Sequence, residues 1–241
     1  MPPGQVTVVI PAFNEERLIQ ETLARVPAWV ADICVVDDAS PDETARRAEE
    51  FGDPRVRVLR HRTNHGVGAA IATGYRAALA RAADFVVVMA GDNQMDPADL
   101  PALLAPLQQG KADYAKGNRL LHERAQDMPR LRRWGTGFLA RLTNWAGGIR
   151  LGDTQCGYTA IRSPTLRALD LEGMWPRYGY PNDLLLQLAG GKHRIVERAV
   201  RPVYGSEKSG LRFWHLATIV YVIGRRWWLL QKSGQSVSSE P

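Results

Sequence analysis

The chain has 241 residues, of which 45% are apolar and 8% aromatic, and this length suits one large α/β domain better than two independent ones. The formal net charge of +6 favours an anionic partner such as a nucleic acid, a diphosphate-containing substrate or an acidic bilayer. We expect no nucleic acid, because the sequence has neither a basic strand platform with aromatic residues nor a helix-turn-helix pattern.

Two features of the sequence bear on its compartment. Cys34 lies in an apolar run and Cys156 in a polar turn, without a second thiol nearby, which is typical of a reducing compartment. The first residues lead directly into a strand-like run without a signal-peptide pattern, and no apolar stretch reaches the ~20 residues that span a bilayer. We therefore expect a cytoplasmic protein whose membrane contact, if any, is peripheral and on the inner face of the plasma membrane.

Short β-branched runs alternate with segments of helical period through the first half of the chain. We expect strands at residues 6–10, 33–37, 56–60 and 85–89, and helices at residues 16–25, 43–51 and 68–83. This order predicts a doubly wound, mostly parallel central sheet flanked by helices.

The second half is less regular, with a basic stretch at residues 119–141, a turn at 153–157 and a candidate strand at 195–204. We interpret it as an elaboration of the α/β core. We expect an α/β domain at residues 1–210, an aromatic-rich amphipathic helix at 211–232 and a disordered tail at 233–241.

Segments rich in carboxylates and amides lie at the ends of three of the expected strands. The candidate ligand-binding residues in them are Pro11, Phe13 and Glu15 at the first strand, Asp37 and Asp38 at the second, and Asp92 and Gln94 at the fourth. Ligands of such sheets bind beyond the carboxyl ends of the strands. We therefore expect these residues to line one crevice.

Asp37 and Asp38 are adjacent carboxylates, which repel each other unless donors or cations attend them. A nucleoside supplies such donors through its base and ribose, and ordinary turn chemistry is the alternative. Ser40 is expected to cap the next helix, with Glu43 completing a capping box. Further along, Asp96 before Pro97 is expected to cap a helix.

Asp92 and Gln94 offer oxygen ligands beside Gly91, which permits close backbone approach. Mg²⁺ or Mn²⁺ bridging a diphosphate needs such ligands.

Four motifs in chain order resemble those of the family 2 inverting glycosyltransferases. They are VIPAFNEE at residues 9–16, VVDDASPDET at 35–44, NHGVGAA at 64–70 and DNQMDP at 92–97. Within that family the chain is most similar to the polyprenyl-phosphate glycosyltransferases of the dolichyl-phosphate mannose synthase type. The resemblance covers roughly residues 5 to 205 and implies a single GT-A domain.

The resemblance also implies a nucleotide-sugar site with Mg²⁺ or Mn²⁺ held by Asp92 and Gln94. The implied nucleotide-sugar ligands are Pro11, Phe13, Glu15, Asp37, Asp38, Gly68, Asp92, Gln94 and Lys208. Lys208 lies in a segment that resembles the family's mobile acceptor loop, although a flexible linker has the same Ser and Gly content. The family often has Asp-x-Asp where this sequence has Ala90 and Asp92.

Arg119, Arg132 and Arg133 lie where similar enzymes contact the acceptor phosphate. A phosphomonoester with a second pKa of ~6 is already an anionic nucleophile at neutral pH, and guanidinium groups suit its oxygens. A solvated basic face is the alternative.

The catalytic candidates are Asp92, Asp153 and Asp183. Asp153 looks like the acidic turn that lines the sugar site in the family. Asp183 lies where relatives carry a base, and it is equally a candidate ligand of a sugar hydroxyl or the N-cap of a helix at residues 184–188.

The C-terminal segment at residues 213–230 combines aromatic residues with Arg225 and Arg226 and is followed by Lys232. Aromatic rings beside cations are typical of a helix at an anionic bilayer surface. Packing of this helix on the sheet is the alternative.

The leading function is transfer of a hexose from a UDP- or GDP-sugar to a polyprenyl phosphate. A second hypothesis keeps the donor and uses a saccharide or protein hydroxyl as acceptor. A third, motivated by Ala90, is a nucleotide-sugar-binding scaffold without catalysis.

Overall fold

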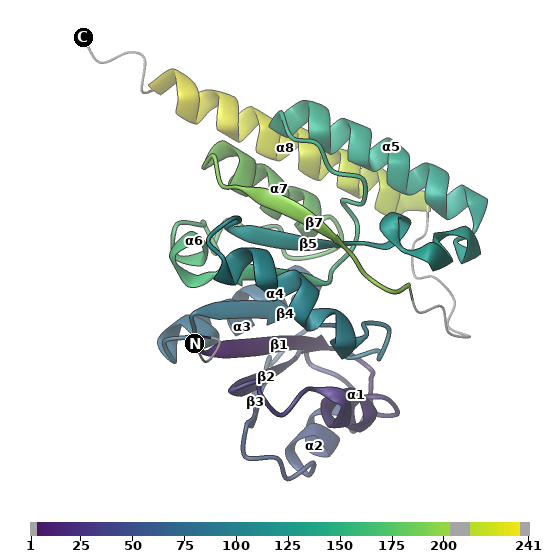
Figure 1. Cartoon of the computed structure of the whole chain (residues 1–241), viewed down its shortest axis with the longest axis vertical. Helices are drawn as coiled ribbons and strands as arrows, with labels where there is room; N and C mark the ends of the chain where they lie inside the picture. Colours follow the sequence, from purple (N-terminus) through teal and green to yellow (C-terminus); the bar gives the residue numbers. More distant parts are fainter. Residues whose placement is uncertain (1–3, 203–212, 237–241) are drawn as a thin grey trace.

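The structure of the protein, a computed structural model, describes residues 4–202 and 213–236. These residues form a seven-stranded sheet in the order β3-β2-β1-β4-β6-β5-β7, flanked by helices (Figure 1). The strands are β1 (Val6–Ala12), β2 (Asp32–Asp37), β3 (Val56–Arg60), β4 (Phe85–Val88), β5 (Tyr114–Asn118), β6 (Thr159–Arg162) and β7 (Ile195–Ala199). The α-helices are α1 (Ile19–Arg25), α2 (Thr44–Glu49), α3 (Val67–Ala80), α4 (Leu100–Gln108), α5 (Arg130–Gly147), α6 (Ser163–Arg167), α7 (Tyr180–Gly190) and α8 (Phe213–Ser236). Three short 3-10 helices are η1 (Pro97–Asp99), η2 (Arg119–Leu121) and η3 (Glu123–Asp127).

The predicted α/β class with a mostly parallel sheet is confirmed. Strands β3, β2, β1 and β4 pair in parallel, and β6 is antiparallel to both of its neighbours. The four strands expected in the first half of the chain all form. Strands β5 and β6 were not expected from the sequence. Strand β5 contains the polar residues Lys116 and Asn118, and β6 has the sequence TAIR, so neither is a continuous apolar run like β4.

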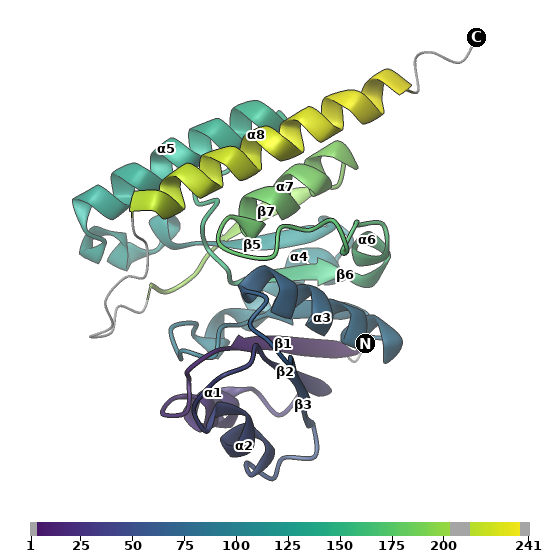
Figure 2. The same ribbon diagram turned by 180° about the vertical axis from the view of Figure 1, so that it is seen from behind.

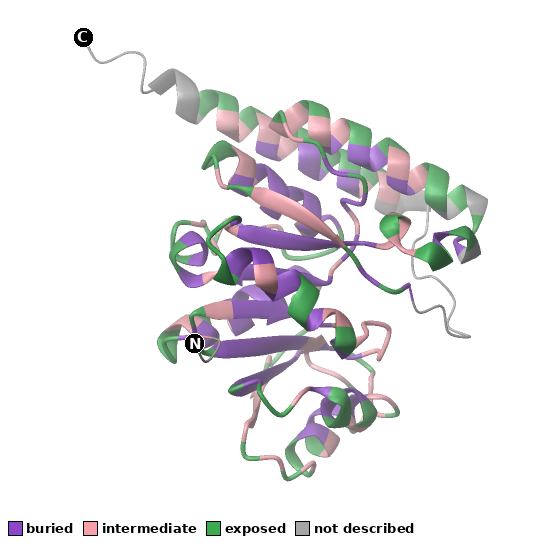
Figure 3. Cartoon of the chain, viewed as in Figure 1, coloured by how far each residue is buried: buried purple, intermediate pink, exposed green. Residues whose placement is uncertain are grey.

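Helices cover both faces of the sheet, and side chains of alternate strand residues divide between two cores. Val8 and Ile10 of β1 belong to the core beneath α1, α2 and α4. Val9, between them, belongs to the core beneath α3, α6 and α7. Central strands are therefore buried on both sides (Figure 3), which explains why they read as continuous apolar runs.

Helices α5 and α8 lie side by side in a further layer at one end of the molecule (Figures 1 and 2). They pack on α7 through a third apolar cluster of Leu139, Leu186, Ile219 and Ile223. The predicted C-terminal helix is therefore present. It packs on the body of the protein through α7 and α5. None of the helices in the described ranges is long and apolar enough to cross a membrane.

Candidate functional site

The loops that follow β1, β2 and β4 meet at the carboxyl edge of the sheet, as the sequence predicted. Ala12 pairs with Asp37 across β1 and β2. Thr22 Oγ1 donates to the carbonyl of Gly91 at 3.0 Å. A Cβ on Gly91 would lie 3.4 Å from Ala12 Cβ and 3.5 Å from Glu15 Cγ. The three strand ends therefore form one continuous wall.

Each of these loops contains a non-glycine residue in the left-handed backbone region. They are Asn14, Ala39 and Asn93, with φ of 60°, 61° and 57°. Asparagine tolerates this conformation, whereas alanine pays roughly 1–2 kcal/mol for it. Strained backbone of this kind is concentrated at functional sites.

Asp38 is fixed by the loop that precedes α3. Its Oδ1 accepts from the backbone N–H of His65 at 2.9 Å and contacts His61 Nδ1 at 2.7 Å, and its Oδ2 accepts from Gly66 N–H at 2.6 Å. His61 in turn contacts Thr73 Oγ1 at 3.0 Å through Nε2. Asp38 therefore stabilises the loop before α3. This is the structural role in a turn that the sequence analysis gave as the alternative to nucleoside binding.

Asp37 differs from its neighbour. Its side chain is buried, Oδ2 accepts from Ser40 N–H at 3.3 Å, and Oδ1 has no hydrogen-bond partner among the residues that the structure describes. A buried carboxylate oxygen without a donor is costly. Oδ1 is therefore an acceptor that a ligand with an N–H or O–H group would satisfy.

Two predicted helix caps have different outcomes. Asp96 caps η1, because its side chain accepts from Ala98 N–H. The cap predicted for Ser40 is wrong, since Ser40 Oγ accepts from Asn14 N–H at 3.1 Å and α2 begins only at Thr44. Asp42 Oδ1 accepts from Thr44 N–H at 3.1 Å instead.

Asp92, Gln94 and Arg119 line the same small cavity of about 60 Å³. The remaining lining residues are Met95, Cys156, Gly157, Tyr158, Val200, Arg201 and Pro202. The cavity thus joins the end of β4, the end of β5 and the turn before β6. It brings together the predicted metal ligands and one predicted acceptor arginine.

Arg119 and Asp153 form a two-point ion pair at this cavity. Arg119 Nε donates to Oδ2 at 2.8 Å and Nη2 donates to Oδ1 at 3.0 Å. Asp153 also accepts from the N–H groups of Gln155 and Cys156 at 3.0 and 3.1 Å. Burial alone would raise the pKa of Asp153, but Arg119 lowers it below the ordinary value. Asp153 is therefore an anion that holds Arg119 in place.

Two further buried groups support this turn. Lys116 is fully buried and donates to the carbonyl of Cys156, and burial lowers the pKa of its ammonium group. Glu197 on β7 accepts from the N–H groups of Gly152 and Asp153 at 2.8 and 2.9 Å. The acidic turn is consequently held from both sides.

Asn182 on α7 connects the turn to α5. It is fully buried and donates to Thr143 Oγ1 of α5 at 2.7 Å. Its Oδ1 accepts from Gln155 Nε2 at 3.1 Å. One amide thus spans the outer helix layer and the cavity wall.

Asp183 lies apart from the residues that line the cavity. It is fully buried in the first turn of α7 and is bound by Arg226 of α8, with Nε to Oδ1 at 2.7 Å. Oδ2 accepts from Arg226 Nη2 at 3.0 Å and from Trp175 N–H at 2.9 Å. The N-cap alternative is wrong, because the helix begins at Tyr180 after Gly179.

The other predicted site residues are more widely distributed. Phe13 is exposed beyond β1. A Cβ on Gly68 would lie 2.2 Å from the carbonyl oxygen of Trp175, so this glycine permits close packing of α3. Arg133 lines a separate groove on α5. Lys208 and the side chain of Arg132 lie outside the described part of the chain.

The sequence did not single out several residues of the site. Arg201 and Tyr158 line the cavity, and Tyr158 Oη donates to the carbonyl of Asp96 at 3.0 Å. His61 is the partner of the buried Asp38. The expectation that Arg226 meets an anionic bilayer is wrong, because Arg226 is buried and binds Asp183. The separation of His61 and Arg226 from these partners along the chain leaves no local pattern that would have identified them.

Within the described residues, no three His, Cys, Asp or Glu side chains gather around a common metal position. Mg²⁺ in nucleotide sites is usually held by one or two carboxylates together with substrate phosphates. Asp92 and Gln94 line the same cavity, so one carboxylate and one amide oxygen would suit a metal that takes its other ligands from substrate phosphates.

Comparison with known proteins identifies the family. The model of glycosyl transferase family 2 matches residues 7–168. The chain belongs to glycosyltransferase family 2. It is 36% identical over 206 residues to the undecaprenyl-phosphate mannosyltransferase of Micrococcus luteus, covering 80% of this chain and 81% of that protein. It is 26% identical over 215 residues to a UDP-N-acetylglucosamine–dolichyl-phosphate N-acetylglucosaminyltransferase of Methanococcus voltae, with 83% and 86% covered. The predicted family, and its polyprenyl-phosphate members as relatives, are thus confirmed.

Solved structures that are similar to this chain confirm the GT-A fold. Glucosyl-3-phosphoglycerate synthase of Mycobacterium tuberculosis in complex with UDP matches with a TM-score of 0.70 and 22% identity, covering 93% of this chain and 80% of that one. The same synthase has been solved with Mn²⁺, UDP-glucose and phosphoglyceric acid. At this identity the likeness concerns the fold alone.

Proposed function

We propose that this glycosyltransferase moves a hexose from a UDP- or GDP-sugar to a polyprenyl phosphate at the inner face of the plasma membrane. The observation that carries the proposal is the common cavity of Asp92, Gln94 and Arg119 at the carboxyl edge of the sheet. It puts oxygen ligands for a metal-bound diphosphate beside a guanidinium group suited to a second phosphate. The relatives named for undecaprenyl-phosphate and dolichyl-phosphate substrates support this acceptor class.

On the donor side, Asp37 Oδ1 offers a buried acceptor to a base N–H or a ribose hydroxyl. Asp92 and Gln94 would hold Mg²⁺ or Mn²⁺, which supplies positive charge where negative charge develops on the leaving diphosphate. Such stabilisation amounts to several kcal/mol. Pro11, Phe13, Glu15 and Gly68 remain predicted nucleotide-sugar contacts, and Lys208 remains a predicted diphosphate contact.

On the acceptor side, Arg119 would orient the phosphate whose oxygen attacks the sugar carbon. This nucleophile needs no general base, because it is already ionised at neutral pH. Asp153 keeps the Arg119 guanidinium directed to the cavity through their two hydrogen bonds. We therefore assign Asp153 a positioning role, with Arg132 and Arg133 as further predicted phosphate contacts.

A hydroxyl acceptor would require a base. Asp183, the predicted candidate, is enclosed by Arg226, Trp175 and Gln187. This arrangement favours a structural role for Asp183 and hence the phosphate acceptor. A scaffold without catalysis remains the alternative motivated by Ala90.

The test is transfer of radiolabelled sugar from UDP-glucose, UDP-N-acetylglucosamine, UDP-galactose and GDP-mannose to undecaprenyl phosphate, with Mg²⁺ or Mn²⁺ and then with EDTA. We expect metal-dependent lipid product from one donor and at least about a hundredfold loss in Asp92→Asn. Asp170→Asn is the control, because Asp170 is an exposed carboxylate that binds Gly173 N–H in a surface turn. Donor binding without any lipid product would overturn the proposal.

A further inference from the structure

The outer face of α5 carries a row of exposed apolar and aromatic side chains. Leu131, Trp134 and Trp145 are 81%, 66% and 69% exposed, and Phe138 lies between them at 41%. Their spacing of three, four and seven residues puts them on one stripe of the helix. The opposite stripe is buried, with Thr136, Leu139, Ala140 and Thr143 against the rest of the protein. The aromatic row is therefore directed away from the core.

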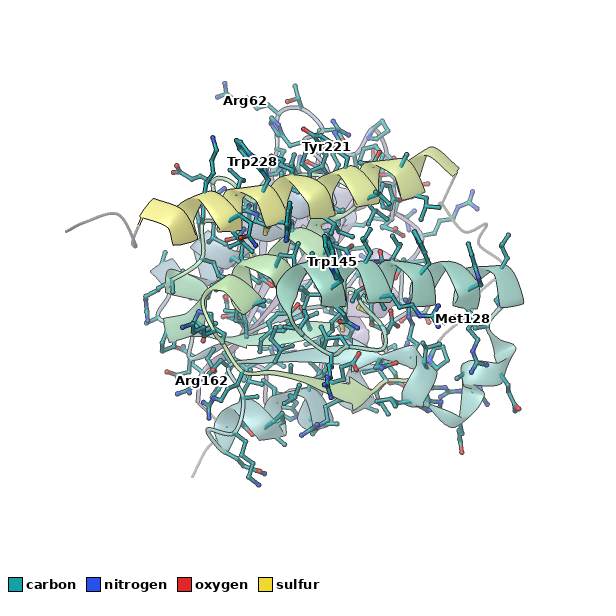
Figure 4. All side chains as sticks on the ribbon, turned by 90° about the horizontal axis from the view of Figure 1, so that it is seen from above. Arg62, Met128, Trp145, Arg162, Tyr221 and Trp228 are labelled. Carbon is teal, nitrogen blue, oxygen red and sulfur yellow. The ribbon has the colours of Figure 1, made fainter. Side chains whose placement is uncertain are left out.

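Helix α8 presents a similar outer face beside it. Tyr221 and Trp228 are 61% and 51% exposed, and Lys232 Nζ lies 3.9 Å from the centre of the Trp228 ring. Seen from the end of the molecule, Trp145 lies between the two helices and Tyr221 and Trp228 project from the other side of α8 (Figure 4). Trp145 stacks on Trp227 with ring centres 5.6 Å apart, which joins the two helices into one layer.

The charge of this layer has a single sign. Neither α5 nor α8 contains an aspartate or glutamate, whereas Arg133 and Arg141 of α5 and Lys232 of α8 are exposed cations. Arg226 of α8 does not add to this charge, because it is buried against Asp183. Arg133 and Arg141 line a groove of about 360 Å³ together with Trp134, Gly137 and Phe138. The rings of Trp134 and Phe138 stack in parallel, 5.9 Å apart. The groove thus offers an apolar floor with guanidinium groups at its sides.

We propose that the layer of α5 and α8 is a docking face for an anionic lipid bilayer, with α5 as its centre. Aromatic rings enter the headgroup region, and arginines beside them meet lipid phosphates. A face with arginines and no acidic residues is complementary in charge to a bilayer rich in anionic lipid. A protein partner of ordinary composition, with charges of both signs, would match it less well.

The position of this face also suits the acceptor. Helix α5 follows η2 and η3 directly after Arg119, and Asn182 ties α5 to the turn at the cavity. If the acceptor is a polyprenyl phosphate, as proposed above, docking through α5 would hold the cavity at the bilayer surface, level with the phosphate of the acceptor. The docking itself does not depend on that assignment.

Flotation with vesicles tests the face. Wild type is expected to bind vesicles of phosphatidylcholine mixed with phosphatidylglycerol, more weakly at high salt, and to bind phosphatidylcholine alone poorly. The W134A/F138A variant is expected to bind the anionic vesicles at least about tenfold more weakly. The R133E/R141E variant should lose about fivefold for each arginine removed.

The controls carry the same changes elsewhere on the surface. Trp29→Ala removes an exposed tryptophan that is outside the layer, and R76E/R167E reverses two exposed arginines on α3 and α6. Trp29→Ala should not alter binding of the anionic vesicles. R76E/R167E should weaken binding less than R133E/R141E does, because it reverses two charges outside the layer. Circular dichroism of each variant confirms that it is folded.

A second readout separates docking from catalysis. W134A/F138A should retain transfer to a short, water-soluble prenyl phosphate and lose transfer to a long-chain acceptor in vesicles. If wild type binds no anionic vesicles, or W134A/F138A binds them as well as wild type, the docking proposal is overturned. A dimer in solution that W134A/F138A dissociates, without vesicle binding, would make the face an interface between copies instead. If wild type binds vesicles but glycosylates neither acceptor, the proposed function fails and the docking face stands.

Discussion

Arg226 of α8 encloses the carboxylate of Asp183 of α7 with two hydrogen bonds, at 2.7 and 3.0 Å. Both side chains are buried. Arg226 Nη2 also donates to the carbonyl of Gly173 at 2.9 Å. The pair therefore fixes the outer helix layer to α7 and to the segment that precedes it.

Removing the arginine should destabilise the fold strongly. Arg226→Ala leaves the Asp183 carboxylate buried without its cation, a change that costs about 3–5 kcal/mol. Urea denaturation followed by circular dichroism measures the loss. Arg46→Ala, which removes exposed pairs with Glu43 and Glu50, should have a much smaller effect. Similar losses in the two variants would contradict the structural role of the buried pair.

Asp37 and Asp38 should respond differently to substitution. Asp37→Asn replaces an oxygen that has no hydrogen-bond partner within residues 4–202 and 213–236, so we expect a KM for the donor raised by about tenfold and no loss of thermal stability. Asp38→Ala leaves the N–H groups of His65 and Gly66 without their acceptor, which costs about 1–3 kcal/mol. Thermal melts and donor titrations measure both quantities. A reversed pattern would show that Asp38 is the ligand-binding carboxylate.

Arg119→Lys keeps the positive charge and loses the planar fork that pairs with Asp153. We expect the KM for the acceptor phosphate to rise by about tenfold, because the cation is no longer held at two points. The dissociation constant of the donor nucleotide serves as the internal control and should stay unchanged. An equal loss of donor affinity would assign Arg119 to the diphosphate instead.

The stability of the fold should fall in acid partly through Asp113. Arg194 lowers the pKa of this carboxyl to about 2 by hydrogen bonds at 2.8 and 3.1 Å. Because the unfolded chain binds the proton more readily, Asp113 stabilises the fold above pH ~4 and loses this contribution as the pH falls toward 2. The free energy of unfolding of Asp113→Asn, measured by urea denaturation between pH 4 and 2, should depend less steeply on pH than that of wild type. An unchanged slope would mean that the pair contributes nothing in solution.

The sequence predicted the parts of this molecule that depend on local pattern. Apolar runs and turns identified the first four strands, and the parallel order identified the edge where Asp37 and Asp92 lie. The burial of both faces of β2 explains why its run is continuous. The family motifs at these strand ends added the nucleotide-sugar assignment.

What the sequence did not predict depends on contacts between distant segments. Ser40 has the residue type of a helix cap, but the N–H of Asn14 in another loop takes its hydroxyl. Asp183 is a candidate base by resemblance to relatives, and no local signal shows that Arg226 reaches it from α8. Likewise, the exposed row on α5 appears only once Leu139 and Thr143 are known to face inward.

Asn182 has a consequence for how this protein loses its structure. Its amide is shared by Thr143 of α5 and Gln155 of the turn at the cavity, so neither segment opens without exposing an unsatisfied polar group of the other. Segments coupled in this way tend to open together in amide hydrogen exchange. We therefore expect the outer helices and the cavity wall to form one cooperative unit, so that loosening of α5 by heat should abolish turnover before strands β1 to β4 have melted.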